Sequence, residues 1–321
     1  MYAMQVTEFD SPLTLRELDT PEPSAGEVVI KVAACGLNFG DTLLVKGTYQ
    51  EKPALPFTMG MEMAGVISAV GSDVTGLRVG QRVAAYSGKN GLAEYAAVSA
   101  SVCVPIPDMM PFTDAAAFLI TYGTSHLALE DRARLKPGER LLVLGASGGV
   151  GLTAVELGKL MGAEVIACAR GADKLDICKQ MGADHLINSD TDDIRDSVKA
   201  LGGADVLYDP IGGEQFKAAF RACNPGARLL PLGFASGDVP QIPANILLVK
   251  NMTVLGLYIG GYAKLNPKAL TDSFATLLGW YAEGKIKPHV SNVLPLREAN
   301  AGLDLLRSRA ATGKVVIDVT A

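Results

Sequence analysis

Apolar positions follow two different spacings along the chain, and the change between them marks a domain boundary. Up to Pro111, short β-prone runs are separated by Gly, Pro, Asp and Ser, which predicts irregular β-structure with long loops. From Asp114 to Glu130, Ala and Leu instead recur at helical spacing. We therefore place the boundary near residue 120. The β-prone runs are Val28 to Ala33, Ala64 to Val70, Arg82 to Tyr86 and Ala93 to Val98.

From Arg140 onward, apolar strands alternate with helical patterns. One such pattern places Val150, Ala154 and Leu157 at i, i+4 and i+7. Parallel neighbours in a sheet need long right-handed crossovers, so the alternation predicts an α/β domain with a doubly wound parallel sheet. The expected strands are Leu141 to Leu144, Val165 to Ala169, His185 to Ile187, Val206 to Tyr208, Arg228 to Leu232 and Val254 to Tyr258.

The alternation stops after about residue 262. A helix over Pro267 to Ala282, a loop through Pro288 and a strand over Lys314 to Asp318 follow, and we expect them to return to the first domain. The predicted organisation is a β-rich domain made of residues 1–120 and 263–321, with the α/β domain, residues 121–262, inserted in it.

The sharpest local signal is a glycine-rich turn between the first α/β strand and the helix after it. Ala146, Gly148 and Gly151 occupy the three slots of a G-x-G-x-x-G dinucleotide fingerprint, so one slot is substituted. Glycine lets the backbone approach a pyrophosphate, and the helix N-terminus stabilises its charge. The alternative is a plain tight turn. The predicted cofactor-binding residues of this turn are Ala146, Ser147, Gly148, Gly149 and Val150.

The residue after the second α/β strand bears on the choice of cofactor. An acid at this position, nineteen residues after Gly151, would bind the ribose hydroxyls of NAD, but the chain has Arg170. Arg170 and Lys174 can neutralise a 2′-phosphate by charge-assisted hydrogen bonds, which favours NADP(H). The alternative is that both cations lie on a solvated helix end, where Asp173 accompanies them.

Composition and charge narrow the function classes. The 321 residues include 29 Lys and Arg against 34 Asp and Glu, a net charge of −5, and neither sign forms a long block. Nucleic-acid binding needs concentrated basic charge, so we expect no nucleic-acid partner. Hydrophobic residues make up 49% of the chain, which excludes global disorder.

Targeting and redox signals favour a reduced, cytoplasmic protein. The N-terminal stretch carries Glu8 and Asp10 and lacks the pattern of a signal peptide. The longest uncharged apolar run, Leu141 to Val155, is too short to span a bilayer. The five cysteines are scattered and never form a CxxC pair, so we expect no disulfides.

Six motifs in order carry a resemblance that extends from end to end of the chain. They are ACGLNFGD at 34–41, GMEMAGVI at 60–67, VGQRV at 79–83, ASGGVG at 146–151, PLGFASG at 231–237 and RAATGKVV at 309–316. The sequence resembles the zinc-independent quinone oxidoreductases, or zeta-crystallin-like group, of the medium-chain dehydrogenase/reductase superfamily. The resemblance implies a GroES-like catalytic domain built from both chain ends, a Rossmann domain between them, and a cofactor cleft at their junction.

The zinc-ligand positions of the superfamily separate its branches. Where the alcohol dehydrogenases have a ligand cysteine this chain has Asn38, and where they have Gly-His-Glu it has Met61 between Gly60 and Glu62. Asn and Met are poor zinc ligands, and Cys35 stands alone, so we expect a buried thiol and an enzyme without metal. Without a Lewis acid, acceptors that take hydride readily are favoured, namely quinones and α,β-unsaturated carbonyls.

The resemblance also assigns roles to individual residues. Asn38 is similar to an asparagine near the nicotinamide, Tyr49 to a tyrosine that donates to a carbonyl oxygen, and Asp41 lies in the same segment. Alternatively, Asn38 and Asp41 cap a helix, and Tyr49 packs at the domain edge. Further residues implied to contact the cofactor are Thr124, Ser189 (where some relatives place a tyrosine), Phe234, Ser236, Tyr258, Gly260 and Arg309. Two of these residues have an alternative to a cofactor contact. Phe234 could belong to the core, and Arg309 could lie on the surface of a helix.

Three functions follow from this reading. The first is an NADPH-dependent quinone oxidoreductase, the second an NADPH-dependent enoyl or alkenal reductase, and the third a non-catalytic, crystallin-like NADPH-binding protein. The partners expected are a small quinone or enone and a second copy of the chain. The strand Val254 to Tyr258 would be an exposed apolar sheet edge, which predicts a homodimer.

Overall fold

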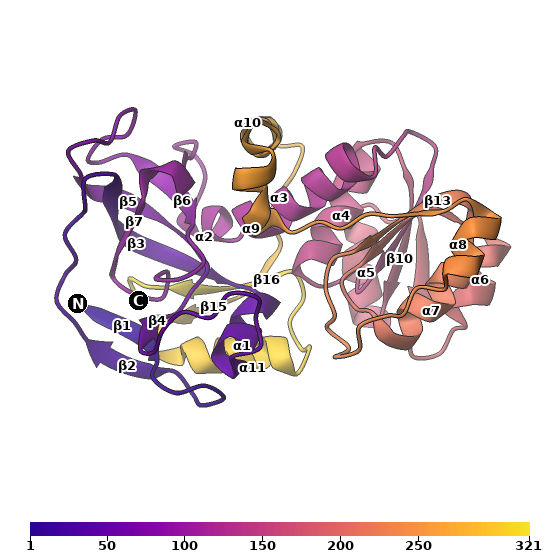
Figure 1. Cartoon of the computed structure of the whole chain (residues 1–321), viewed down its shortest axis with the longest axis horizontal. Coiled ribbons are helices and arrows are strands. Elements are labelled where there is room, and N and C mark those ends of the chain that lie inside the picture. Colours follow the sequence, from indigo (N-terminus) through magenta and orange to yellow (C-terminus); the bar gives the residue numbers. More distant parts are fainter. The chain divides into compact units, whose positions relative to one another are not determined.

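The computed structural model describes all residues 1–321 and divides the chain into two compact units (Figure 1). The first unit comprises Met1–Ile120 and Leu278–Ala321, and the second comprises Thr121–Leu277. The second unit is therefore inserted between two segments of the first. Its end lies after Leu277, whereas the sequence pattern placed it after residue 262.

Packing explains why the second unit extends beyond residue 262. The Tyr262 hydroxyl donates to Asp131 at 2.6 Å. A Cβ added at Gly123 would lie only 2.8 Å from the Phe274 ring, so this ring is in close contact with the backbone of an earlier helix. Phe274 and Leu277 are both buried. Residues up to 277 thus complete the core of the second unit, although they lack its strand and helix rhythm.

The first unit is built on a mixed sheet of seven strands and a smaller sheet of three. The large sheet contains β3 (Glu27–Leu37), β5 (Glu62–Val70), β6 (Arg82–Tyr86), β7 (Tyr95–Ser99), β8 (Cys103–Pro105), β15 (Val290–Pro295) and β16 (Lys314–Asp318). Their order is β15-β16-β3-β5-β6-β8, with β7 also pairing with β3. The small sheet contains β1 (Tyr2–Val6), β2 (Thr14–Glu17) and β4 (Phe57–Thr58), in the order β2-β1-β4.

Short helices cover the sheets of the first unit. They are α1 (Phe39–Lys46), α2 (Phe112–Ala116), α11 (Ala299–Arg307) and the 3-10 turns η1 (Ala100–Val102) and η3 (Leu296–Glu298). Helices α1 and α11 pack against each other, and α11 also covers β16. One apolar core joins residues of β3, β5 and β16, such as Ile30, Met63 and Ile317. The core places the start of α1, the start of β5 and the start of β16 close together.

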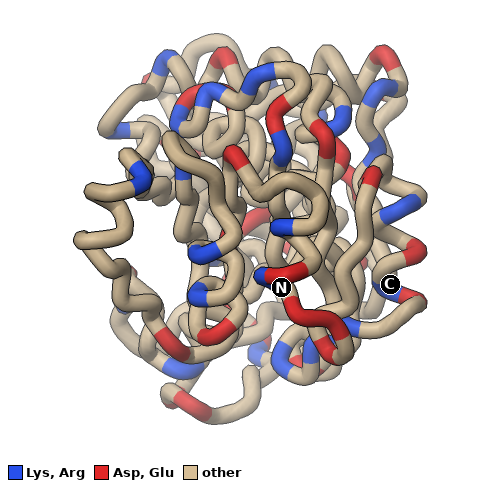
Figure 2. Tube along the Cα trace, turned by 90° about the vertical axis from the view of Figure 1, so that its right-hand side faces the viewer, with Lys and Arg blue, Asp and Glu red and all other residues tan.

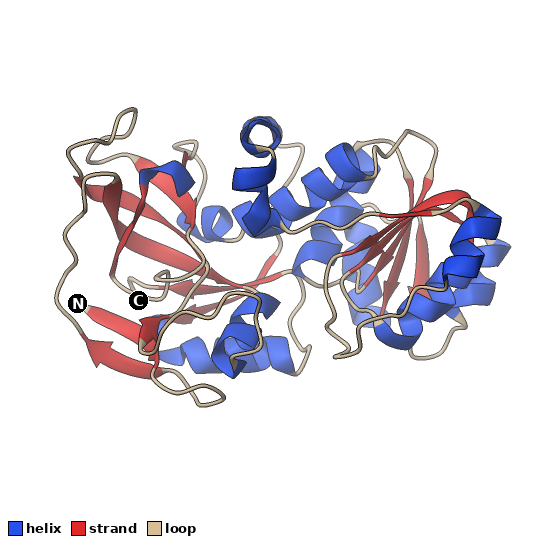
Figure 3. Ribbon diagram, in the orientation of Figure 1, coloured by secondary structure: helices blue, strands red, loops and turns tan.

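The second unit is a doubly wound parallel sheet with helices on both faces (Figure 3). Its strands are β9 (Arg140–Leu144), β10 (Glu164–Ala169), β11 (His185–Asn188), β12 (Ala204–Asp209), β13 (Cys223–Pro231) and β14 (Thr253–Val254). The order is β11-β10-β9-β12-β13-β14, and every pair is parallel. The α/β class and the Rossmann sheet expected from the sequence are confirmed.

Helices of the second unit follow its strands in alternation. They are α3 (Leu119–His126), the π-helical segment η2 (Leu127–Arg132), α4 (Gly149–Leu160), α5 (Ala172–Gln180), α6 (Ile194–Ala200), α7 (Gly213–Ala222), α8 (Ala244–Lys250), α9 (Ile259–Leu265) and α10 (Pro267–Ala282). Helix α10 continues past Leu277 into the first unit, where the Tyr281 hydroxyl donates to Asp114 at 2.8 Å.

Two expected elements differ in the structure. The helix expected over Asp114 to Glu130 is broken after Ala116, because the backbone N–H of Ile120 donates to the Glu62 carboxylate instead of to a helical carbonyl. The strand expected over Val254 to Tyr258 is only the two-residue β14, which pairs with Arg228 and Leu229 of β13, and beyond it the carbonyl of Gly256 accepts from the Arg132 side chain. The homodimer stays a prediction, without the long edge strand that motivated it.

Two further properties bear on partners. No helix of the structure is both long and apolar enough to cross a membrane. Basic and acidic residues are interspersed along the trace, with no block of one sign (Figure 2).

Candidate functional site

The glycine turn of the second unit has the geometry of a phosphate-binding loop. It begins where β9 ends, and Gly145 has a φ of +57°, which favours glycine. A Cβ added at Gly151 would lie 2.2 Å from the carbonyl oxygen of Gly145, so the helix approaches the loop too closely for any side chain. Gly148 is the extended N-cap residue of α4.

The first N–H groups of α4 are free to bind an anion. Leu152 is the first residue of the helix to donate a backbone hydrogen bond, to Gly148 at 2.8 Å. The preceding N–H groups of Gly149, Val150 and Gly151 have no backbone acceptor. Free donors at a positive helix end suit a pyrophosphate, so these residues fit the dinucleotide expected from the sequence.

Buried hydroxyl groups fix the start of α4 to α3. Ser125 contacts the hydroxyls of Thr153 and Tyr208, each at 2.8 Å, and Thr153 donates to the carbonyl of Thr121 at 3.2 Å. Burial raises the pKa of Tyr208, which keeps its hydroxyl neutral. Thr124, predicted to contact the cofactor, lies on α3 and is half-buried. The network therefore holds Thr124 and the phosphate-binding turn in one rigid part of the second unit.

Arg170 and Ser189 lie at the ends of two neighbouring strands. Arg170 follows β10, is exposed and makes no hydrogen bond or ion pair within the protein. The Ser189 backbone donates to the carbonyl of Ala169 at 3.0 Å, and the Ser189 hydroxyl is buried without a partner. Lys174 lies in the first turn of α5. The exposed guanidinium of Arg170 is free to bind a phosphate at this edge of the sheet, whereas the Ser189 hydroxyl is enclosed and stays a predicted cofactor contact.

The remaining predicted cofactor residues of the second unit lie beyond β13 and β14. Phe234 is 42% exposed, so its alternative assignment to the core is wrong. Ser236 follows in the same loop, and its backbone donates to Ile211 at 2.9 Å, which fixes this loop beside the end of β12. Tyr258 is the N-cap residue of α9, and Gly260 lies in the first turn of that helix.

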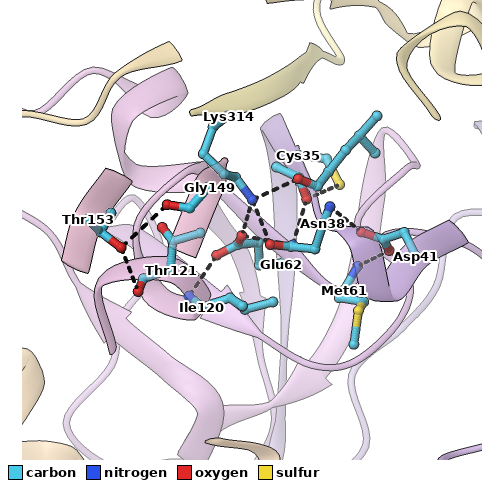
Figure 4. Close-up of polar contacts among 12 residues, drawn as sticks. Cys35, Asn38, Asp41, Met61, Glu62, Ile120, Thr121, Gly149, Thr153 and Lys314 are labelled. Atoms are coloured by element: carbon cyan, nitrogen blue, oxygen red, sulfur yellow. Dashed lines mark hydrogen bonds and ion pairs between the residues drawn. The ribbon is translucent and has the colours of Figure 1, made fainter. Parts of the chain in front are cut away.

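The first unit holds a buried cluster of charged and polar side chains at the start of α1 (Figure 4). Lys314 donates to Glu62 at 2.7 Å, to Asn38 at 2.8 Å and to the carbonyl of Leu37 at 2.8 Å. Glu62 also accepts from Asn38 at 2.9 Å and from the Ile120 backbone at 3.0 Å. Lys314 is 4% exposed and Glu62 1%, so the ion pair is shielded from water and all of its polar atoms are satisfied.

Asp41 acts in the structure as a helix cap. One of its oxygens accepts from the Asn38 backbone at 2.7 Å and the other from the Met61 backbone at 3.2 Å. Burial raises the pKa of Asp41 to about 7, although these two N–H donors favour the carboxylate. Both oxygens are thus used in joining α1 to the start of β5. This geometry supports the capping alternative for Asp41.

Tyr49 lies close to this cluster. A Cβ added at Gly40 would lie 3.3 Å from the Tyr49 ring and 3.1 Å from the Met61 sulfur, so Gly40 leaves room for both side chains. Tyr49 is half-buried at the margin of the core. The structure therefore brings together Asn38, Asp41 and Tyr49, the three residues predicted to act in catalysis.

The residues at the superfamily's zinc position do not fit a metal. Met61 and Asn38 occupy the ligand positions, and burial raises the pKa of the Cys35 thiol well above its ordinary value. The Lys314 ammonium also binds the carboxylate of Glu62. No group of three or more His, Cys, Asp or Glu side chains in the structure is placed to hold a metal ion.

Arg309 lies in the first unit at the end of α11. Its φ of +56° is in the left-handed region, and its N–H donates to Leu306 at 3.1 Å while that of Ala310 donates to Leu305 at 3.0 Å. These two bonds form a Schellman motif, in which this position usually holds glycine. An arginine at such a position is a costly choice for the fold alone.

Lys314 and Glu62 were not among the predicted site residues. Their signal in the sequence is a lone charge within an apolar strand, in GKVVID and in GMEMAGVI. Two opposite charges of this kind, each too costly to bury alone, imply a pair within one sheet. The hydroxyl network of Ser125, Thr153 and Tyr208 has no such signal, because single hydroxyl residues are common in helices and strands.

Comparisons with known proteins agree with this geometry. Residues 24–108 match the alcohol dehydrogenase GroES-like domain, and residues 149–279 match the family described as zinc-binding dehydrogenase. The quinone oxidoreductase-like protein 2 homolog of Nematostella vectensis is 39% identical over 98% of this chain and 88% of its own length.

Two solved structures are similar to the whole chain. The Escherichia coli quinone oxidoreductase complexed with NADPH has a TM-score of 0.92 at 28% identity, over 99% of this chain and 100% of that one. The CurK enoyl reductase has a TM-score of 0.88 at 28% identity, over 99% of this chain and 98% of that one.

Proposed function

Because the chain belongs to the quinone oxidoreductase group of the medium-chain dehydrogenase/reductase superfamily, we propose that it reduces a quinone or a similar conjugated carbonyl with NADPH and without zinc. The observation that carries the proposal is the set of free N–H groups at the start of α4, together with the unpaired Arg170.

The cofactor is NADP(H). The turn from Ala146 to Val150 binds its pyrophosphate, and Arg170 neutralises the 2′-phosphate, assisted by Lys174, with Ser189 placed beside the adenosine. When bound, NADPH supplies hydride at its nicotinamide ring. We assign Thr124, Phe234, Ser236, Tyr258 and Gly260 to contacts with the rest of the cofactor, and Arg309 to a phosphate.

The chain's own groups at the zinc position make zinc chemistry unsuitable. Lys314 supplies a buried positive charge there, and its three acceptors leave it no hydrogen for a ligand. Substrates must therefore accept hydride without a Lewis acid, which favours quinones and enones. Tyr49 is the candidate proton donor, since a phenol hydroxyl can donate to the reduced oxygen.

A second candidate function is reduction of a C=C bond next to a carbonyl or thioester. The likeness to the CurK enoyl reductase favours it. The same metal-free chemistry serves both acceptors, because an enolate, like a hydroquinone, delocalises the charge left by hydride. A non-catalytic NADPH-binding role would leave the cofactor site intact and give no turnover.

A substrate panel separates these functions. The purified protein is mixed with NADPH and, in turn, with simple quinones, alkenals and enoyl thioesters, and the loss of NADPH absorbance is followed. We expect the highest kcat/KM with quinones and little activity with NADH. Turnover confined to enones supports the second candidate, and tight NADPH binding with no turnover supports the non-catalytic role. Absence of NADPH binding in calorimetry would refute all three.

A further inference from the structure

Two charged side chains fix the Asn38 carboxamide in one orientation (Figure 4). Lys314, which can only donate, lies 2.8 Å from Oδ1 of Asn38, and the Glu62 carboxylate, which only accepts, lies 2.9 Å from Nδ2. A flipped amide would place its NH2 group against the ammonium and its oxygen against the carboxylate. The chemistry of the two partners therefore settles which way the amide faces.

This orientation uses both N–H donors of Asn38. One hydrogen of Nδ2 is donated to Glu62 and the other to the carbonyl oxygen of Gly36, at 3.3 Å. Oδ1 has two lone pairs and accepts from Lys314 at 2.8 Å, while the Asp41 backbone N–H, which faces Asn38 in the capping box of α1, donates to the Asn38 backbone carbonyl oxygen at 3.0 Å. The side chain is left with one unused position, and that position is an acceptor.

Of the three residues, only Asn38 is half-buried, because Glu62 and Lys314 are almost fully enclosed. We propose that Lys314 and Glu62 are positioning residues that hold Asn38 as a hydrogen-bond acceptor toward an N–H or O–H group of a ligand. Asn38 then does not donate to the carbonyl oxygen of an oxidised acceptor. This inference rests on the proposed function, since that function defines the ligands.

Two ligand groups of the proposed reaction carry a suitable donor. One is the hydroxyl of the reduced acceptor, which the oxidised quinone lacks. The other is the carboxamide NH2 of the nicotinamide. Each is tested by a pair of probes of which only one carries the donor: 1,4-naphthohydroquinone against its dimethyl ether, in which methyl groups replace the hydroxyl hydrogens, and NADPH against its 3-acetylpyridine analogue, in which a methyl group replaces the NH2.

Two variants remove the acceptor in different ways. Asn38→Leu has nearly the same shape and leaves the ion pair of Lys314 and Glu62 intact. The double variant Lys314→Met with Glu62→Gln keeps Asn38 but removes both charges that orient it. Ile67→Ala, a core truncation elsewhere in β5, is the control for lost stability. Dissociation constants are measured by calorimetry without oxygen, with NADP⁺ present for the hydroquinone pair.

We expect the wild type to bind one donor-bearing probe about threefold to tenfold tighter than its partner probe, the value of one hydrogen bond. Asn38→Leu and the double variant should both lose this preference, and Ile67→Ala should keep it. Loss in the hydroquinone pair identifies the reduced acceptor as the donor, and loss in the NADPH pair identifies the carboxamide. Either result supports the inference.

Three outcomes would overturn it. The first is a wild type with no preference in either pair, and the second is a preference that survives in Asn38→Leu. The third is a preference that the double variant keeps, which would show that Lys314 and Glu62 do not position Asn38. If the double variant does not fold, hydrogen exchange of the Asn38 NH2 decides instead, because two donated hydrogens must both be protected. Lack of quinone turnover by the wild type is a separate result, which refutes the proposed function.

Discussion

The backbone N–H of Ile120 donates to Oε2 of Glu62 at 3.0 Å, at the last residue of the first compact unit before the chain enters the second. The other carboxylate oxygen accepts from Lys314 and from Asn38. One enclosed side chain therefore fixes three segments of the first unit, namely the end of its long N-terminal part, the start of α1 and the start of β16. The loss of Glu62 should affect more than one ion pair.

We predict that Glu62→Ala lowers the free energy of unfolding by about 3–5 kcal/mol, because it leaves the Lys314 ammonium buried without a counter-charge. Urea unfolding monitored by circular dichroism measures this change. The control Glu22→Ala removes an exposed carboxylate and should change stability by less than about 0.5 kcal/mol. Equal stability of the two variants would show that the ion pair contributes nothing to the fold.

The Rossmann sheet was predictable because its signal is local. Each strand, such as β9 or β10, is a short apolar run followed by a helix with 3.6-residue spacing, and handedness rules then limit the topology. The glycine turn was predictable for the same reason. Helix α4 approaches its loop so closely at Gly151 that no residue with a side chain fits there, and the sequence shows this glycine directly.

The break in the helix after Ala116 was not predictable from local pattern. Residues 114–130 have helical spacing throughout, and the break depends on Glu62, which is 58 positions away from Ile120 in sequence. The pair of Lys314 and Glu62 is separated by 252 positions and forms only once β16 and β5 have joined the same sheet around β3. Contacts of this kind form only when distant segments pack together, so the local pattern around either residue does not predict them.

Replacement of Arg170 by Asp should change the choice of cofactor. The exposed, unpaired guanidinium is free to bind a 2′-phosphate, and an Asp would repel it while accepting from the ribose hydroxyls of NADH. We expect the ratio of kcat/KM for NADPH to that for NADH to fall by about 10- to 100-fold, the worth of a charged hydrogen bond. Steady-state kinetics with both cofactors give the ratio.

Arg221→Asp is the matched control for this prediction. Arg221 is also exposed, but it lies in the last turn of α7, directly before β13 begins, and so at the opposite edge of the parallel sheet from Arg170, which follows the end of β10. It makes the same change of charge, so a general electrostatic effect would appear in both variants. A ratio left unchanged by Arg170→Asp would remove Arg170 from the cofactor site.

Replacement of Arg309 by Gly should stabilise the fold and weaken cofactor binding. The left-handed φ of +56° costs an arginine about 1 kcal/mol that glycine does not incur. If Arg309 contacts a cofactor phosphate, the Kd for NADPH should rise by about tenfold as that contact is lost. Thermal unfolding and calorimetric titration measure the two effects. Arg134→Gly, at an exposed arginine with a φ of +50°, should stabilise the protein without changing the Kd.

The last prediction concerns acid stability and His126. This imidazole is 6% exposed, its Nδ1 lies 2.9 Å from the Ser273 hydroxyl, and burial lowers its pKa to about 4. The unfolded chain binds a proton near pH 6.5, whereas the folded chain does so only near pH 4, so stability is lost as the pH falls through this window.

Between pH 7.5 and pH 5 the loss due to His126 is about 2 kcal/mol. Asp41 acts in the opposite direction, because its raised pKa adds stability as the pH falls. The contribution of His126 is therefore measured as the difference between the wild type and His126→Gln, which cannot titrate but can still hydrogen-bond Ser273. Urea unfolding at the two pH values should show the wild type losing about 2 kcal/mol more than the variant. Parallel losses in both proteins would mean that His126 is protonated in the fold as readily as in the unfolded chain.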